Sequence, residues 1–277
     1  MANFADLMAE AQDRPFEGWD FSYDGRIVTE EPWDFGGLVD AFAANSPDLL
    51  DLGTGGGEWL SARMLPKRTV ATEGWAPNVP AARARLAPLG VEVVAVEGAP
   101  ENVAQEEGAP GGGLPFPDGS FHLVVSRHES YLPAEVRRVL APGGRFVTQQ
   151  VASTIADDFH RLLGEAPPAT ARVWDLDFAL SQLSRAGFVI EAREQGDQLM
   201  RFADVGAFAW YLKNLPFIIP DFRIDRMQGR LERLHRKTAG KGIAARQPVF
   251  RITARKSTTW SIGPRSVCGS RTSRCAK

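Results

Sequence analysis

The sequence has few of the residues from which metal and disulfide sites are built. Its 277 residues include two cysteines and four histidines, and both cysteines, Cys268 and Cys275, lie in the last ten positions. No group of Cys or His residues has the spacing of metal ligands. We therefore expect no metal site, and the sequence argues against a structural zinc module.

Long apolar runs are also missing. A membrane-spanning helix needs roughly 20 apolar residues in succession, and no stretch approaches that length. The first residues, MANFADLMAEAQDRP, carry acids and lack a basic segment followed by an apolar one, as a signal peptide would have. With 44% hydrophobic and 24% charged residues, the composition is that of an ordinary globular protein. We expect a cytoplasmic protein without membrane contacts.

Excess positive charge is absent too, because the formal net charge is −2. Residues 257–277 carry basic side chains and no acid, so the rest of the chain is more acidic than the total suggests. Neutralising phosphates with basic side chains supplies most of the affinity for nucleic acid. The acidic body therefore argues against a nucleic-acid substrate.

From residue 48 onward, short buried-strand patterns alternate with helical ones. This alternation predicts an α/β fold with a mixed sheet of seven strands flanked by helices. The expected strands cover residues 49–52, 69–72, 91–96, 121–126, 145–151, 188–193 and 249–254. The expected helices between them cover residues 58–64, 79–89, 134–140 and 175–186.

Three segments lie outside this alternation. Residues 1–47 hold aromatic side chains interrupted by Gly and Pro, and we expect a short helical arm with an irregular cap. Residues 194–248 are too many for a hairpin loop, and they predict a cap inserted before the last strand of a domain that covers 48–256. The tail, 257–277, is rich in Ser, Thr, Gly and Arg, and we expect it to be disordered.

A glycine-rich segment, DLGTGGG at residues 51–57, joins the first expected strand to a helix. Glycine lets a ligand approach the backbone, and a helix N-terminus supplies free N–H groups and partial positive charge. A dinucleotide fingerprint needs a further glycine where this chain has Glu58, an anion that would repel a pyrophosphate. The spacing favours a zwitterionic amino-acid ligand, and a glycine-rich turn without any ligand is the alternative.

Glu73 ends the second expected strand, 22 residues after Asp51. An acid at this place can accept hydrogen bonds from both ribose hydroxyls of a nucleoside. A solvated carboxylate at a strand end is the alternative. The position of Glu73 relative to Asp51 favours the ribose interpretation.

The segments LLDLGTGGGEWL, TVATE, LPFPDGSFHLVVS and EVRRVLAPGGRFVTQQV follow one another in the sequence. In this order they resemble the class I methyltransferases that depend on S-adenosylmethionine (SAM), nearest the broad group called type 11 methyltransferases. The resemblance covers Leu49–Val151 well and the sheet as far as Lys256 more loosely. It implies a Rossmann-like fold and SAM as the cofactor.

In that family, the first loop holds the methionine part of SAM and the acid after the second strand holds the ribose. Residues after the third strand contact the adenine, and those after the fourth face the methyl group. This chain departs from the family after the third strand, where it has Glu-Gly-Ala-Pro and a Gly-rich insertion. The cofactor contacts implied by the resemblance are Asp51, Gly53, Thr54, Gly55, Gly57, Glu73, Gly98, Ala99, Ser126 and Arg127.

The residues directly after the fourth expected strand include two candidate catalytic side chains, His128 and Glu129. Methyl transfer is an in-line displacement, so much of the catalysis can come from holding the nucleophile close and aligned. A base is needed only if the acceptor loses a proton. His128 has a suitable unperturbed pKa for that role, and Glu129 would replace it as the base or orient it. The alternative is that His128 only hydrogen-bonds the cofactor or the backbone.

Two further groups of side chains each allow two interpretations. Aromatic residues of the arm and the cap line a substrate pocket or pack as core, and core packing is the commoner outcome. The basic residues of 223–237 form a solvated helix face or contact an anionic substrate, and the solvated face is favoured.

The function expected from these features is methyl transfer from SAM to an O or N atom of a small molecule, which the arm and cap would enclose. Methylation of an RNA base is the first alternative, although the chain lacks a zinc module and an Asn/Asp-Pro-Pro-aromatic run after the fourth strand. A SAM-binding protein without catalytic activity is the second alternative. The acceptor and the oligomeric state stay open.

Overall fold

The computed structural model describes residues 3–16, 21–103, 112–169, 174–238 and 240–258. Apart from its first two residues, the expected disordered tail lies outside this range. The centre of the molecule is one sheet in the order β1-β7-β8-β6-β5-β2-β3-β4. Its strands are β1 (Ile27–Glu30), β2 (Asp48–Leu52), β3 (Arg68–Glu73), β4 (Glu92–Ala95), β5 (Phe121–Arg127), β6 (Leu140–Val151), β7 (Phe188–Phe202) and β8 (Ile243–Lys256).

The strands β4, β3, β2, β5 and β6 run parallel, whereas β8 runs antiparallel to both β6 and β7. This is the expected Rossmann-like mixed sheet. An eighth strand, β1, pairs antiparallel with the far end of β7 and was not among the seven predicted strands. Its four residues follow a Gly-containing turn and precede a proline, so the pattern in the sequence is too short to indicate a strand.

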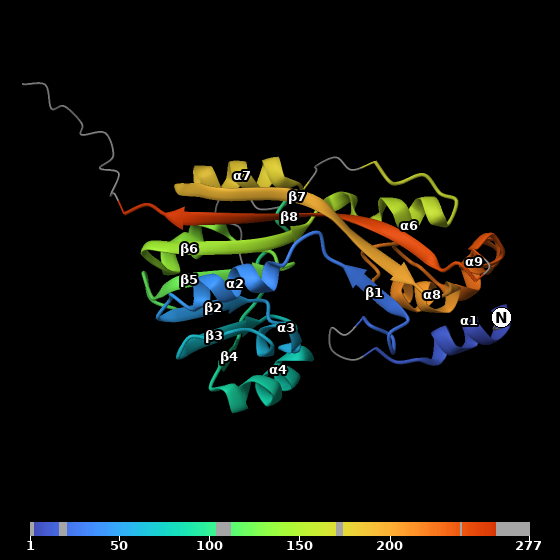
Figure 1. Cartoon of the computed structure of the whole chain (residues 1–277), viewed down its shortest axis with the longest axis horizontal. Coiled ribbons are helices and arrows are strands. Elements are labelled where there is room, and N and C mark those ends of the chain that lie inside the picture. Colours follow the sequence, from blue (N-terminus) through green and yellow to red (C-terminus); the bar gives the residue numbers. More distant parts are fainter. Residues whose placement is uncertain (1–2, 17–20, 104–111, 170–173, 239, 259–277) are drawn as a thin grey trace, which may run out of the picture.

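Successive side chains of the central strands point to opposite faces of the sheet, as strand geometry requires. Leu50 and Val124 pack in a core with α5 and α7, whereas Leu49 and Val125 pack in another core with α2, α3 and α4. Figure 1 shows the resulting layers, with helices on both faces of the sheet. The helices of this part are α2 (Phe35–Ala43), α3 (Glu58–Ser61), α4 (Asn78–Leu86), α5 (Pro133–Val139) and α7 (Leu176–Arg185).

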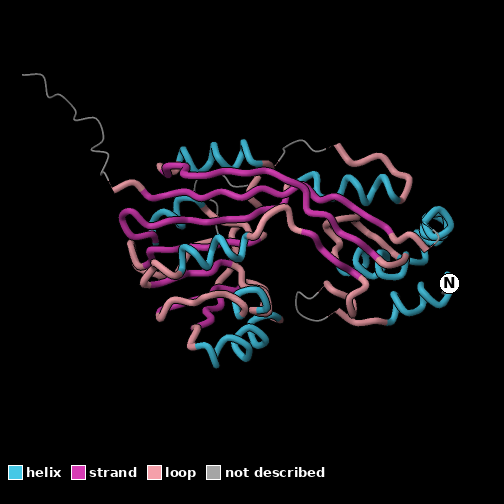
Figure 2. The backbone as a smooth tube through the Cα atoms, viewed as in Figure 1, coloured by secondary structure: helices cyan, strands magenta, loops and turns pink. Residues whose placement is uncertain are grey.

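The strands β7 and β8 continue well beyond the central sheet and carry a third core. Figure 2 shows both as unbroken strands that cross the whole molecule. Residues 194–202 and 243–248, which the sequence assigned to the inserted cap, belong to these strands. Only 203–242 lie between them. Beside the strand ends lie α1 (Phe4–Asp13), α6 (Asp157–Leu162), α8 (Val205–Asn214) and α9 (Ile224–Thr238).

The third core joins the N-terminal arm to the inserted segment. Leu7 and Tyr23 of the arm pack with Phe208 and Trp210 of α8, and the rings of Tyr23 and Trp210 stack at 4.7 Å. Asp204 caps α8 by accepting from the N–H groups of residues 206 and 207, and it also binds Arg26 of the arm at 2.7 Å. Phe208 and Trp210 therefore form core, whereas Phe21, Tyr211 and Phe217 line a cavity, and Trp19 lies outside the described residues.

Candidate functional site

The glycine-rich loop lies between β2 and α3, at the carboxyl edge of the parallel strands. Gly53, Gly55 and Gly57 have φ angles of 67°, 62° and 80°, a region that residues with a Cβ rarely adopt. The alternate glycines are thus required by the backbone conformation of the loop. A Cβ on Gly53 would also collide with the side chain of Glu129, so Gly53 leaves room for that side chain.

The loop is held to the neighbouring strand β3 by its own N–H groups. The Thr54 N–H donates to the Thr72 carbonyl at 2.9 Å, and the Gly55 N–H donates to Glu73 Oε2 at 2.6 Å. The following helix, α3, has four residues instead of the seven expected. A helix of one turn contributes little dipole, so the shape of the loop matters more here than a helix N-terminus.

Two acids at this edge are buried. The Glu73 carboxylate accepts from the N–H groups of Gly55 and Trp75, at 2.6 and 2.7 Å, and burial raises its pKa. Asp51, the last residue but one of β2, is 3% exposed, and burial raises its pKa to about 7. Both carboxyls therefore hold a proton more readily than solvated ones. A bound cation would favour their charged forms.

A small pocket lies on one side of the loop. Gly53, Gly98, Ala99 and Leu114 line it, together with Glu129. The expected adenine contacts, Gly98 and Ala99, thus lie together at the end of β4, next to the loop.

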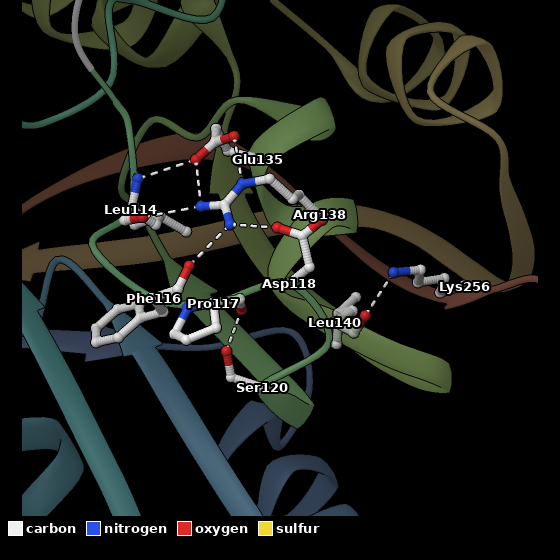
Figure 3. A network of polar contacts seen from close by, with 9 residues as sticks. All are labelled: Leu114, Phe116, Pro117, Asp118, Ser120, Glu135, Arg138, Leu140 and Lys256. Atoms are coloured by element: carbon white, nitrogen blue, oxygen red, sulfur yellow. Dashed lines mark hydrogen bonds and ion pairs between the residues drawn. The ribbon is translucent and has the colours of Figure 1, made fainter.

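The far wall of the small pocket is fixed by Arg138 of α5 (Figure 3). The guanidinium donates to the carbonyl oxygens of Leu114 and Phe116, each at 2.8 Å, and to the carboxylates of Asp118 and Glu135. Glu135 in turn accepts from the Leu114 N–H at 3.0 Å. This network fixes the segment that leads from the undescribed residues 104–111 into β5.

A larger cavity, of about 540 Å³, lies on the other side of the loop. Asp51, Gly53 and Thr54 form its inner end, and Arg127, His128 and Glu129 its edge at β5. The arm, β7, α8 and the segment after α8 form its outer walls. These walls are largely apolar and include Ile27, Met200, Tyr211, Leu215 and Phe217.

Gly53 and Glu129 line both the small pocket and the large cavity. The Glu129 side chain lies over Gly53, and its Oε1 would be 3.3 Å from a Cβ on Gly98. Burial, followed by the charge of Glu73, raises the pKa of Glu129 to about 7. Ser126 is fully buried beneath this residue and donates to the Glu129 carbonyl at 3.0 Å, so it supports the site from below.

His128 occupies an unusual backbone conformation, with a φ of 62°. Its N–H donates to the Gln149 carbonyl at 2.8 Å, which holds the strained residue in place. The surrounding protein, and then the charge of Arg127, lowers the pKa of His128, although the residue is exposed on the side of the cavity. Although its side chain is reached from the cavity, the imidazole is therefore neutral at physiological pH.

A carboxylate of the N-terminal arm reaches this edge of the sheet. Glu31 follows β1 and pairs with Arg127 at 3.2 Å. It also accepts from the side-chain amides of Gln198 and Gln149, at 3.1 and 3.4 Å. Gln149 in addition accepts from Trp33 Nε1 at 2.5 Å, and its Nε2 lies 3.2 Å from His128 Nε2. The arm is therefore part of the cavity and not only a cover.

The structure brings the predicted residues together at the carboxyl ends of β2, β3, β4 and β5. Gly55 and Gly57 shape the loop, Ser126 lies below the site, and Glu73 binds the Gly55 N–H and borders a separate hollow beside α4. The remaining predicted residues line the small pocket or the large cavity. Glu31, Gln149 and Gln198 were missed by the sequence analysis. A signal existed for Gln149, because a polar pair interrupts the otherwise apolar strand RFVTQQV and buried polar groups need partners. Glu31 carries no such signal.

The order and directions of the strands, with ligand-lining residues at their carboxyl ends, define the class I methyltransferase fold. Residues 50–148 match the family described as methyltransferase domain. Over these residues the chain is therefore similar to the methyltransferase domain family, and its fold is that of class I methyltransferases.

Solved structures have the same fold. A candidate methyltransferase from Bacillus halodurans C-125 is 19% identical, with 81% of this chain and 99% of that chain covered and a TM-score of 0.53. The YcgJ protein from Bacillus subtilis is 18% identical, with coverages of 80% and 98% and a TM-score of 0.54. A protein of unknown function from Deinococcus radiodurans R1 is 17% identical, with coverages of 83% and 90% and a TM-score of 0.54. No protein of curated function matches the sequence.

Two further features concern the part of the chain that the structure describes. No described helix has the length and apolar character needed to cross a membrane. Within the same residues, no group of three or more His, Cys, Asp or Glu side chains is placed to hold a metal ion.

Proposed function

We propose that the protein transfers a methyl group from SAM to an O or N atom of a small molecule. The observation that carries this proposal is the large cavity, which starts at the glycine-rich loop and extends between the arm and the inserted segment. The family of the domain suggests the reaction, and the cavity suggests where the acceptor binds.

The residues present fit SAM. The Glu129 side chain lies between Gly53 and Gly98, where the small pocket and the large cavity meet. An elongated ligand can span this junction, with its adenine beside Gly98 and Ala99 and its ribose hydroxyls on Glu73. The acidic side chains of Asp51 and Glu129 suit the positive charges of the methionine part.

Bound SAM would supply an electrophilic methyl group, and the chain itself would position the acceptor and take up a proton. Among the candidate bases, Glu129 has a pKa of about 7, matched to neutral pH, whereas the pKa of His128 is lowered from its ordinary value. A base works best when its pKa lies near the working pH. We therefore assign the proton to Glu129 when the acceptor has to lose one.

The walls of the cavity favour a small acceptor over RNA. Its described lining combines apolar side chains with the carboxyls of Glu31, Asp51, Glu58 and Glu129, and its one basic side chain, Arg127, is paired with Glu31. Phosphate binding needs several basic groups, which this lining does not offer. An enclosed apolar wall instead suits a molecule with an apolar part, and it excludes water from the reaction.

Titration calorimetry with S-adenosylhomocysteine tests the cofactor assignment, and we expect one site per chain. A panel of small alcohols, phenols and amines with radiolabelled SAM then tests the transfer. Cofactor binding without transfer to any acceptor would favour the non-catalytic alternative. Transfer to RNA but not to small molecules would overturn the proposal.

A further inference from the structure

The side chains of Trp33, Gln149 and His128 form a chain of hydrogen bonds from the arm to the cavity. Trp33 Nε1 carries a hydrogen and can only donate, so the Gln149 atom that it contacts at 2.5 Å must be the amide oxygen. The orientation of the Gln149 amide is thereby fixed. Its NH₂ group faces Glu31 Oε2 and His128 Nε2, at 3.4 and 3.2 Å.

An amide NH₂ has two hydrogens and no acceptor, so His128 Nε2 must accept one of them. A neutral imidazole has one protonated nitrogen, and here that nitrogen is Nδ1. Gln149 is fully buried and its second hydrogen is directed to Glu31, so it cannot turn to offer an acceptor instead. The backbone of His128 is also held, by its N–H bond to the Gln149 carbonyl.

We propose that Gln149 is a positioning residue that locks His128 as the Nδ1–H form, so that His128 donates a hydrogen bond to an oxygen of the acceptor molecule. His128 lines the large cavity, and Nδ1 has no hydrogen-bond partner within the part of the chain that the structure describes. The Nδ1–H group is thus the one that a bound molecule can reach. The lock itself does not depend on the proposed function, whereas the assignment of the acceptor oxygen rests on it.

This assignment narrows the class of acceptor. The cavity that His128 lines also has the apolar side chains of Met200 and Leu215 in its walls, and an oxygen acceptor on an apolar skeleton matches both features. Such a molecule carries a carbonyl, ether or hydroxyl oxygen. The lock also removes His128 as a base, because the lone pair on Nε2 is already used.

Nuclear magnetic resonance of protein labelled with ¹⁵N-histidine tests the lock directly, without any cofactor. The His128 signals, assigned with His128→Asn, should show a protonated Nδ1 and an unprotonated Nε2 at pH 8. In Gln149→Met the NH₂ group that Nε2 accepts from is gone, so we expect a mixture of the Nδ1–H and Nε2–H forms. Gln198→Met is the matched control, because Gln198 also binds Glu31 but does not contact His128, and it should leave the His128 signals as they are.

An Nε2–H form in the unaltered protein would overturn the lock, as would an unchanged Nδ1–H form in a folded Gln149→Met variant. Thermal unfolding and the affinity for S-adenosylhomocysteine identify any variant that fails to fold. Trp33→Phe combined with Glu31→Gln removes both groups that orient the Gln149 amide, and this double variant should yield a mixture of the two forms.

Pairs of ligands with the same shape test the acceptor oxygen. Acetophenone and α-methylstyrene form one pair, and cyclohexanone and methylenecyclohexane the other, each added with S-adenosylhomocysteine present. We expect each ketone to shift the His128 Nδ1 signal and to bind about three- to tenfold more tightly than its hydrocarbon partner. Equal binding within both pairs would overturn the acceptor class. If the unaltered protein does not bind S-adenosylhomocysteine at all, that result would instead contradict the proposed function.

Discussion

Two acids at the carboxyl edge of the sheet, Asp51 and Glu129, have pKa values raised to about 7. Both shifts come first from burial, which penalises the charged form of a carboxyl. Each group therefore gains its negative charge as the pH rises through neutrality. The site is more acidic at pH 8 than at pH 6, so its affinity for cations and its capacity to take up a proton increase in the same direction.

Glu129→Gln tests the assignment of the base. If Glu129 takes up the proton, kcat/KM of the unaltered protein rises with pH through about 7 and then levels, because the carboxylate form grows in that range. We expect Glu129→Gln to lower the rate at pH 8 by about a hundredfold or more and to remove the rise. Glu92→Gln, on exposed β4, is the control. If kcat/KM of Glu129→Gln still rises with pH through about 7, the rise comes from Asp51 instead.

Glu73→Ala tests the ribose contact. Hydrogen bonds to a charged group contribute about 1.5–3 kcal/mol, so we expect the affinity for S-adenosylhomocysteine to fall by at least about tenfold in calorimetry. Glu73 also holds the N–H groups of Gly55 and Trp75, so part of the loss reflects a looser loop. Adenosine and 2′,3′-dideoxyadenosine separate the lost ribose contact from the looser loop. If the variant still prefers adenosine to 2′,3′-dideoxyadenosine as strongly as the unaltered protein does, the assignment is contradicted.

At the scale of elements, the parallel half of the sheet could be predicted because each strand is a short apolar run bounded by loop residues. The helices between these strands were predicted to within a few residues of their observed ends. The sequence did not indicate β1, nor the continuation of β7 and β8, because their added residues are exposed and polar on one side. Their pairing depends on contacts with distant segments, which no local pattern records.

Arg138 of α5 tests how one side chain supports a pocket. Its hydrogen bonds to Leu114 and Phe116 fix the segment that lines the small pocket. We expect Arg138→Met to increase hydrogen exchange at residues 114–118 and to weaken adenosine binding, with a small change in global stability. Arg145→Met, which breaks a surface ion pair with Glu191, is the control and should change neither property. Equal protection in Arg138→Met and the unaltered protein would contradict this role.

At the scale of the whole molecule, β7 and β8 contribute to the sheet between its helical layers and to the third core with the arm. Phe208 is fully buried in that third core, and Phe208→Ala should cost about 3–5 kcal/mol of unfolding free energy. Because the two parts share continuous strands, we expect both to lose stability together. Far-ultraviolet dichroism and hydrogen exchange at β2 should report one common transition, shifted to lower denaturant. Separate transitions for the arm and for β2 would contradict the shared framework.

The two continuous strands also bear on how ligands enter. A lid that opens by a hinge needs a few backbone positions that absorb large changes of angle, and β7 and β8 pass from one part of the molecule to the other as paired strand. The inserted segment is thus joined to the central sheet by two continuous, paired strands and not by flexible loops. Entry and exit of ligands then depend on side chains at the rim of the cavity, above all Phe217, which lines the cavity and is 61% exposed. Exchange of acceptor and product would be governed by rotamer changes there, with the backbone as a fixed frame.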